Sequence, residues 1–169
     1  MRLLAWIFVL GVPLSVSAQE PTLADSYRKW HAGLSSANKE DQEKALRQMS
    51  PNKDDVVYMF PKASDKLWPL LEKNNELMLR NLDKIAKEFA SKGKITKIEE
   101  INIRKDKLRS EGSYKRLLTV IPQEAPIFSL IVQHDQGSSG SGSYFFRNGR
   151  WVWIRGMEVI PELLDKLSQ

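Results

Sequence analysis

The sequence predicts an α+β fold in which N-terminal helices pack on a curved antiparallel sheet of about four strands. Three observations support this prediction. Apolar residues recur at helical spacing in the first half, branched apolar runs typical of strands occupy the second half, and an aromatic-rich hairpin pattern follows them. Because no internal repeat or long linker divides the chain, residues 19–169 are expected to form a single domain.

A first helix ending near Ser35 is indicated by four apolar residues at helical spacing: Leu23, Tyr27, Trp30 and Leu34. Asn38 is a suitable N-cap for a second helix, which Pro51 ends. Residues 54–60 then form a short apolar patch that predicts one helical turn.

A long helix is predicted from about Trp68 to Ser91, with Pro69 in its first turn and Gly93 just beyond its end. Its apolar stripe is interrupted at Asn74 and Asn75. Because a buried amide needs hydrogen-bond partners, either side chain could line a ligand cavity. The alternative is that both amides reach solvent or cap a neighbouring segment.

Two strands are predicted at residues 95–104 and 127–134. Between them, residues 114–121 match the helical template and predict a short helix, although their last three residues favour a strand. The glycine- and serine-rich run at residues 136–143 predicts a flexible loop between antiparallel strands. A short terminal helix is expected to start at Pro161.

Asn148 and Gly149 lie between two aromatic-rich runs, a pattern typical of a two-residue type I′ hairpin. The predicted register pairs Arg147 with Arg150, Phe146 with Trp151, Phe145 with Val152, and Tyr144 with Trp153. Because side chains alternate along a strand, one face should carry four aromatic residues: Tyr144, Phe146, Trp151 and Trp153. The other face is apolar too, so the hairpin should lie between two layers, or one face should line a ligand cavity or a subunit interface.

The first 18 residues have the pattern of a secretory signal peptide. A basic start is followed by an apolar run from Leu3 to Val12 and by small residues up to Ala18, after which cleavage is expected. The run is too short to span a bilayer, and no longer one follows. The sequence therefore predicts a soluble periplasmic or secreted protein that packs without disulfides, since it has no cysteine.

The formal net charge is +5, and basic residues gather between Lys92 and Arg116. Such clusters can attract polyanions such as envelope polymers. Acidic residues are interspersed throughout, however, which is typical of an ordinary solvated surface. Nucleic acid is not an expected partner of an exported chain.

Few residues are candidates for catalysis. Glu99 lies in the first predicted strand and could act as a base if it faced an apolar cavity. His134 ends the second strand and could serve as a general acid or base, although Asp135 should point to the opposite face. With only His31 and His134, and no cysteine, neither a metal site nor another cofactor is expected.

The order of helices before a strongly curved sheet, together with the strand Gly149–Ile154, resembles the NTF2-like, cystatin-related α+β superfamily, including its exported members of unknown function. This resemblance implies a cone-shaped pocket between helices and sheet. The superfamily contains isomerases, dehydratases and non-catalytic binding domains, so the fold alone does not select an activity. The chain departs from the usual order because its long helix precedes every strand, and no catalytic residue can be carried over.

The sequence thus favours a non-catalytic exported domain that binds a small ligand or an envelope protein. The ligand-binding candidates are Asn74, Asn75, Tyr144, Phe146, Trp151 and Trp153. One alternative is a small isomerase or hydrolase that uses Glu99 or His134, and a second is a basic binder of envelope polymers. A homodimer is also compatible with the sequence.

Overall fold

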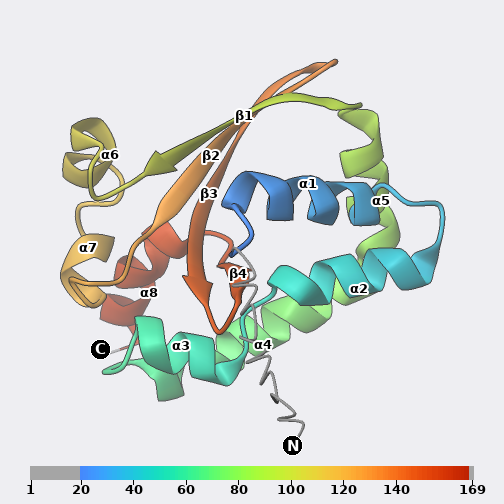
Figure 1. The fold of residues 1–169 in the computed structure, drawn as a ribbon. Helices are drawn as coiled ribbons and strands as arrows, with labels where there is room; N and C mark the ends of the chain where they lie inside the picture. The colour runs from blue at the N-terminus through green and yellow to red at the C-terminus, as the bar shows by residue number, and fades with distance from the viewer. Residues whose placement is uncertain (1–19, 168–169) are drawn as a thin grey trace, which may run out of the picture.

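An antiparallel sheet in the order β1-β2-β3-β4 forms the centre of the fold, and helices pack around it (Figure 1). The computed structural model describes residues 20–167, so the predicted signal peptide lies outside the described residues. The sheet is curved and unclosed, and the α+β class predicted from the sequence is confirmed.

Three helices precede the long helical region, as predicted: α1 (Leu23–Leu34), α2 (Lys39–Met49) and α3 (Lys53–Met59). Each begins with a polar N-cap whose side chain accepts a hydrogen bond from a first-turn amide: Thr22, Asn38 and Asn52. These caps satisfy amides that have no partner within the helix. At α3 the carboxylate of Asp55 also accepts a hydrogen bond from the backbone N–H of Asn52, which completes a capping box.

The predicted single long helix is wrong in two respects. The structure contains two helices, α4 (Ser64–Arg80) and α5 (Leu82–Ser91), which meet at Asn81. The Asn81 side chain donates to the Leu77 carbonyl at 2.8 Å, so it competes with the helical hydrogen bonds and ends α4. In addition, α4 begins at Ser64, so Pro69 lies inside the helix rather than in its first turn. Both Pro69 and Asp65 are exposed, so water can reach the carbonyl that proline leaves unpaired.

The second half supplies the strands, β1 (Ile95–Asn102), β2 (Phe128–His134), β3 (Gly137–Arg147) and β4 (Arg150–Trp153). Short helices complete the chain: α6 (Lys107–Glu111), α7 (Leu117–Val120), a 3-10 turn (Met157–Val159) and α8 (Ile160–Lys166). The predicted helix within residues 114–121 is confirmed as α7, and the terminal helix is confirmed as α8.

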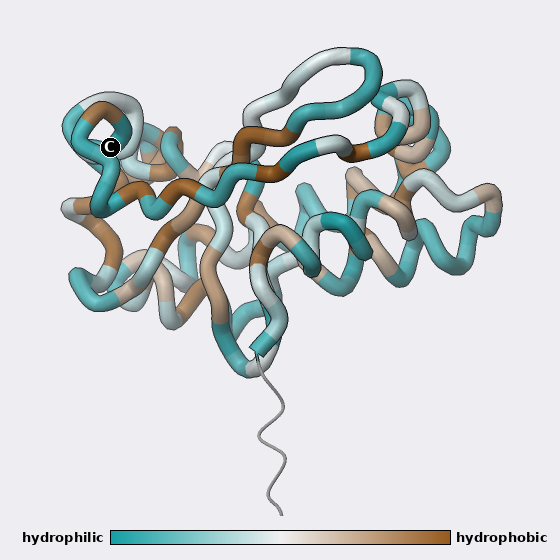
Figure 2. Tube along the Cα trace, turned by 45° about the horizontal axis from the view of Figure 1, so that its top comes forward, coloured by the Kyte–Doolittle hydropathy of each residue, from teal (hydrophilic) through white to brown (hydrophobic). Residues whose placement is uncertain are grey.

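The glycine- and serine-rich run is not a loop, contrary to the prediction. Residues 137–142 are the first half of β3 and pair with β2 from Gly137 opposite His134 to Gly142 opposite Ser129. Only two residues, Asp135 and Gln136, connect the strands, so pairing of the two backbones begins directly after the turn. Backbone hydrogen bonding to β2 therefore overrides the low strand propensity of these residues. The segment appears as a pale stretch at the top of Figure 2.

The predicted hairpin is confirmed residue by residue. Tyr144 pairs with Trp153, Phe145 with Val152, Phe146 with Trp151, and Arg147 with Arg150. Asn148 and Gly149 have φ values of 49° and 74°, as a type I′ turn requires. Both Tyr144 and Phe145 are fully buried, although they point to opposite faces of the sheet.

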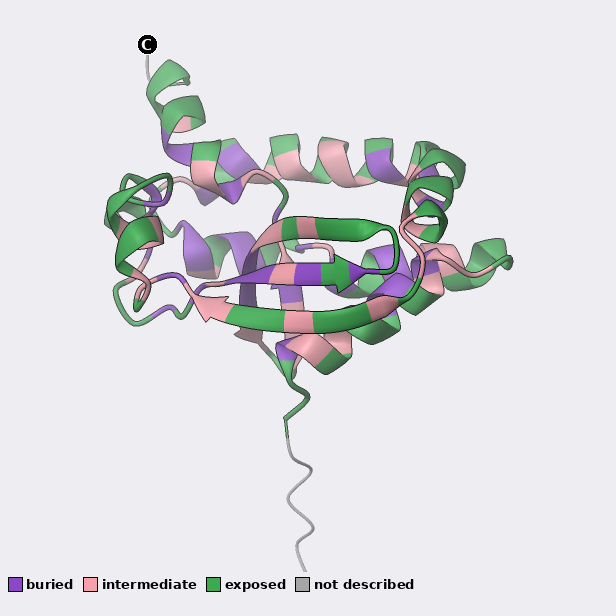
Figure 3. Ribbon diagram, turned by 90° about the horizontal axis from the view of Figure 1, so that it is seen from above, coloured by how far each residue is buried: buried purple, intermediate pink, exposed green. Residues whose placement is uncertain are grey.

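The two faces of the hairpin belong to two separate core clusters. Phe145 and Val152 pack with residues of α3, α7 and α8, whereas Tyr144 packs with residues of α1, α2 and β2. The sheet is thus covered on both sides where it carries the hairpin, which explains why both hairpin faces are apolar. Figure 3 looks onto the other end of the sheet, where no helix lies over it: β1 and the first half of β3 are exposed or intermediate there, whereas β2 between them is mostly buried. Within residues 20–167, no helix is long and apolar enough to cross a membrane.

Candidate functional site

A cavity of about 240 Å³ lies between helices α1, α4 and α5 and strands β3 and β4. Four aromatic side chains contribute to its wall: Tyr27, Trp30, Phe89 and Trp153. Aliphatic side chains of α2, α4 and α5 line it as well: Leu46, Met78 and Ile85. The helices of the N-terminal half and the C-terminal hairpin therefore build the cavity together.

The cavity exists because β3 has small residues where it faces these helices. Ser139 pairs with Val132, and Ser141 pairs with Leu130. Val132 and Leu130 belong to the helix-side core, so the two serines lie on the same face of the sheet. Ser139, Gly140 and Ser141 all line the cavity. A strand with large side chains at positions 139 and 141 would fill this space.

Trp30 is the centre of the aromatic wall. Its ring lies 5.4 Å from Tyr27, 5.0 Å from Phe89 and 5.3 Å from Trp153, measured between ring centroids. These separations and tilted or edge-on arrangements are favourable for aromatic pairs. The indole N–H of Trp153 donates to the Gly142 carbonyl at 2.8 Å. By contrast, the buried Trp30 N–H has no acceptor among residues 20–167.

Three charged residues also line the cavity. Glu88 and Lys92 form an ion pair at 3.4 Å, and the Lys92 ammonium lies 4.4 Å from the centre of the Phe89 ring. Arg155 is exposed and makes no ion pair or hydrogen bond within residues 20–167. The cavity therefore combines an aromatic interior with one uncommitted cation.

A polar groove of about 320 Å³ shares part of this wall, namely Met78, Ile85, Glu88 and Arg155. Asn74, Asn81 and Lys84 line the remainder of the groove. Two larger hollows, of about 610 and 590 Å³, lie beside Pro122 and beside Ala32. Neither of these gathers tryptophan or tyrosine side chains, so the aromatic cavity is the better candidate site.

Tyr27 in the cavity wall and Tyr144 in the core below it remain protonated at neutral pH. Burial raises the pKa of Tyr27 to about 12. Burial also raises the pKa of Tyr144, whose hydroxyl lies 2.6 Å from the Ser141 hydroxyl. Their phenol groups are therefore neutral hydrogen-bonding groups near pH 7.

The predicted ligand-binding residues are distributed over several places. Trp153 lines the cavity, and Asn74 lines the adjoining groove. Tyr144 lies in the core below, whereas Trp151 packs edge-on against Phe128 at 5.4 Å and donates to the Pro21 carbonyl. Phe146 packs against Trp151, at 5.2 Å between ring centroids.

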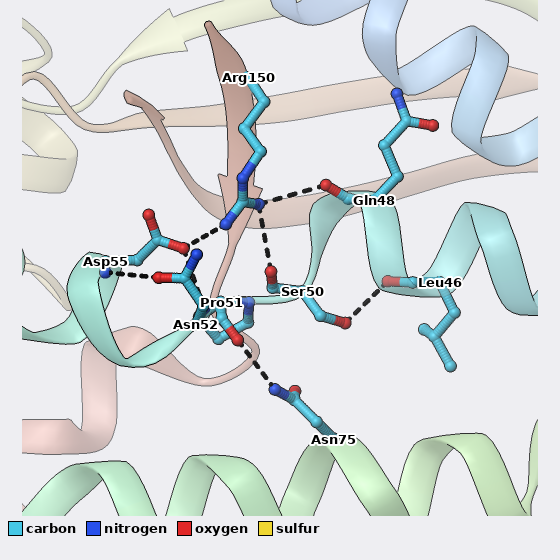
Figure 4. Close-up of polar contacts among 8 residues, drawn as sticks. All are labelled: Leu46, Gln48, Ser50, Pro51, Asn52, Asp55, Asn75 and Arg150. Carbon is cyan, nitrogen blue, oxygen red and sulfur yellow. Dashed lines mark hydrogen bonds and ion pairs between the residues drawn. The ribbon is translucent and has the colours of Figure 1, made fainter. Parts of the chain in front are cut away.

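Asn75 forms a hydrogen bond within the protein and does not line the cavity. Its amide donates to the Pro51 carbonyl at 3.1 Å, where α2 gives way to α3 (Figure 4). This is the capping role that the sequence left open for it. Among the residues of the predicted aromatic face, only Trp153 reaches the cavity.

Glu99 and His134 have contrasting surroundings. Glu99 is exposed on the edge strand β1, where no described pocket includes it. His134 is buried, and its ring lies 5.2 Å from that of His31. Burial, and then the nearby Lys92, lower the pKa of His134, whereas the Gly93 backbone and Asp135 oppose this shift. The imidazole is therefore neutral at pH 7.

His134 also approaches a serine of the cavity wall. Its Nε2 atom lies 3.4 Å from the Ser139 hydroxyl, but its Nδ1 atom has no hydrogen-bond partner among residues 20–167. The Asp135 carboxylate, in the turn after β2, accepts from the backbone N–H of Lys94 instead. Ser139 and His134 therefore lack the carboxylate that orients the histidine in a serine–histidine–aspartate triad.

Arg147 and Arg150, which flank the hairpin turn, have internal partners. The Arg150 guanidinium forms an ion pair with Asp55, whose side chain is 1% exposed, and donates to the carbonyls of Gln48 and Ser50 (Figure 4). Arg147 and Arg150 pair across the hairpin turn, where like charges repel, and the buried Asp55 carboxylate offsets this repulsion. The Arg147 guanidinium lies 4.5 Å from the centre of the Tyr58 ring.

Several basic residues between Lys92 and Arg116 are also used internally. Arg104 donates to the Ala125 carbonyl at 2.9 Å, Arg109 pairs with Asp106 at 3.1 Å, and Arg116 pairs with Asp165 and Glu162 of α8. The Arg116 contacts join the segment around α7 to α8, whereas the Arg109 pair is local to α6. No group of three or more histidine, aspartate or glutamate residues in the described part of the chain could hold a metal ion.

The cavity residues other than Trp153 could not be identified as a site from sequence. Tyr27, Trp30 and Phe89 fit the apolar stripes of amphipathic helices, and the serines fit a loop. Comparison with protein-family models, with curated proteins and with solved structures gave no match. The function of the cavity must therefore be inferred from its own residues.

Proposed function

We propose that the protein is an exported, non-catalytic binding module that takes a small ligand with a flat apolar body into the aromatic cavity. The observation that carries this proposal is the open space between the aromatic residues Trp30, Phe89 and Trp153 and the small residues of β3. Flat ligands stack on such rings, and each aromatic contact is worth about 0.5–1.5 kcal/mol beyond the burial of its area.

Two further points support this proposal. The resemblance to the NTF2-like superfamily implies a pocket between helices and sheet, and the cavity lies between such elements. A wall made by small residues, in a core that is otherwise filled with large side chains, leaves unfavourable empty space unless a ligand or water occupies it.

The proposal can be tested with a neutral flat probe, 1-naphthalenemethanol, by calorimetric titration of the purified protein. The variant Ser139→Leu should abolish binding, because the larger side chain fills the cavity, while the melting temperature stays the same or rises. The variant Trp153→Ala should weaken binding about tenfold, because one aromatic wall is lost.

Trp151→Ala is the matched control, since Trp151 lies on the same hairpin but does not line the cavity. It should leave the affinity for the probe unchanged. Equal loss of binding in Trp151→Ala and Trp153→Ala, or undiminished binding in Ser139→Leu, would contradict the proposal.

A small hydrolase is a second candidate, favoured by the approach of His134 Nε2 to the Ser139 hydroxyl in the cavity wall. A neutral histidine could accept the hydroxyl proton as serine attacks an ester. Hydrolysis of p-nitrophenyl acetate that exceeds the background rate and is lost in both Ser139→Ala and His134→Ala would support this candidate. A rate equal to that of the double variant would exclude it.

A further inference from the structure

We infer that the ligand of the aromatic cavity is an anion whose carboxylate, or a similar oxyanion, binds Arg155 where the cavity joins the polar groove. This inference rests on the proposed function, because it specifies the chemical class of the same ligand. It follows from the charges and the hydrogen-bond donors that the site leaves without partners.

Arg155 is the hairpin arginine that has no internal role. Arg150 is bound to a buried carboxylate, and Arg147 lies over the Tyr58 ring. Arg155 lies two residues beyond the end of β4 and has no ion pair or hydrogen bond within residues 20–167. Its side chain lines both the cavity and the groove, so it can reach a group at the junction of the two.

The charges around this junction favour a negative group. Lys84 lines the groove, is exposed, and forms no ion pair within the described residues. The carboxylate of Glu88 is already paired with Lys92 at 3.4 Å. Two cations, Arg155 and Lys84, therefore remain without an acidic partner at the place where the polar end of a ligand would emerge.

The hydrogen-bonding groups give the same indication. Trp30 lines the cavity, but its indole N–H is buried and has no acceptor within residues 20–167, so it is not one of the groups open to a ligand. Arg155 and Lys84 can only donate hydrogen bonds. The two free cations are thus donors, whereas the Asn74 and Asn81 amides of the groove can both donate and accept, so a ligand with an acceptor-rich group such as a carboxylate complements the cations.

Two probes with the same ring system separate the charge from the cavity: 1-naphthoate and the neutral 1-naphthalenemethanol. The wild-type protein should bind 1-naphthoate about five- to tenfold more tightly at low salt, as expected for a partly exposed charge-assisted contact. The variant Arg155→Glu should remove this preference, because it weakens binding of 1-naphthoate far more than binding of the neutral probe. Added NaCl should weaken binding of 1-naphthoate alone.

Arg47→Glu is the matched control, because Arg47 is exposed on α2 and lines none of the described pockets. It should preserve the preference for 1-naphthoate. Tighter or equal binding of the neutral probe by the wild-type protein would overturn the anion inference and leave the cavity proposal intact. Failure of both probes to bind would instead overturn the proposed function, and the anion inference with it.

Discussion

The two faces of the β3–β4 hairpin differ in how completely they are filled. On one face, Phe145, Val152 and Ile154 are at most 1% exposed and pack against α3, α7 and α8. On the other face, Trp153 is partly exposed and borders the aromatic cavity. One hairpin thus helps to stabilise a closed core and also forms the wall of a candidate site.

The difference originates in the composition of β3. Its second half carries Tyr144, Phe145 and Phe146, whereas its first half contains only glycine and serine. The large side chains fill the space next to β4, and the small ones leave space beneath α1 and α5. The second half of β3 therefore contributes mainly to stability, and the first half leaves the space of the cavity. Substitutions at the filled face and at the cavity should change the free energy of unfolding by different amounts.

The largest effect is expected from truncation on the filled face. Phe145→Ala should destabilise the protein by about 3–5 kcal/mol, because it creates a cavity in a closed core. Trp153→Ala should cost less, since its ring is partly exposed and already borders empty space. Urea unfolding of both variants measures the difference, and equal losses of stability would show that the two faces are packed equally well.

The second effect concerns the arginines on the two sides. Arg150→Ala should destabilise the protein by about 3 kcal/mol, because it leaves the buried Asp55 carboxylate without its cation. Arg155→Ala removes an exposed side chain without a partner and should change stability by less than about 0.5 kcal/mol. Thermal and urea unfolding of the two variants check this contrast, which is wrong if Arg155→Ala is the more destabilising.

The third prediction concerns the histidines beside the cavity. Burial, and then His134 and Lys92, lower the pKa of His31 from 6.5 to about 4. The unfolded chain therefore binds more protons than the folded protein between these values, so stability is retained above pH 6.5 and lost as the pH falls toward 4. The expected loss between pH 7 and pH 4.5 is roughly 2–3 kcal/mol for His31 alone.

Replacement of His31 by leucine provides the test. Urea unfolding at several pH values should show a shallower pH dependence for His31→Leu than for the wild-type protein over the same interval. The side chain of His134, whose pKa is lowered in the same direction, should retain part of the dependence. Parallel pH profiles for the two proteins would show that His31 does not titrate on unfolding.

The smallest expected effect is a difference in stability between alanine substitutions at two glycines of β3. An added Cβ at Gly142 would collide with the hydroxyl of the buried Tyr114, whereas one at Gly140 would meet no atom within 4 Å. Gly142→Ala should therefore destabilise the protein by about 1–2 kcal/mol through overpacking. Gly140→Ala should be neutral or slightly stabilising, because it restricts the unfolded chain. Melting temperatures that fall equally would contradict this difference.

Local sequence patterns predicted most of the helices and the complete register of the hairpin. The turn residues Asn148 and Gly149 define which residues pair, because only two residues separate the strands. The helix cap Asn38 was readable for the same reason, since its hydrogen bond is made within one turn, whereas the cap Asn52 was not predicted. The interruption at Asn81 and the start of α4 were missed, because several arrangements satisfy the same apolar stripe.

The candidate site depends on contacts that are distant in sequence. Trp30 meets Trp153 across more than a hundred residues, and residues 139–141 become a wall only because β3 pairs with β2. The sequence by itself determined that both faces of the hairpin must be covered, since alternation along a strand places apolar groups on each side. Only the tertiary structure decided that the helices on one face of the hairpin pack without space and those on the other face leave a cavity. The volume between the helices and the sheet depends on how every helix packs against the strands.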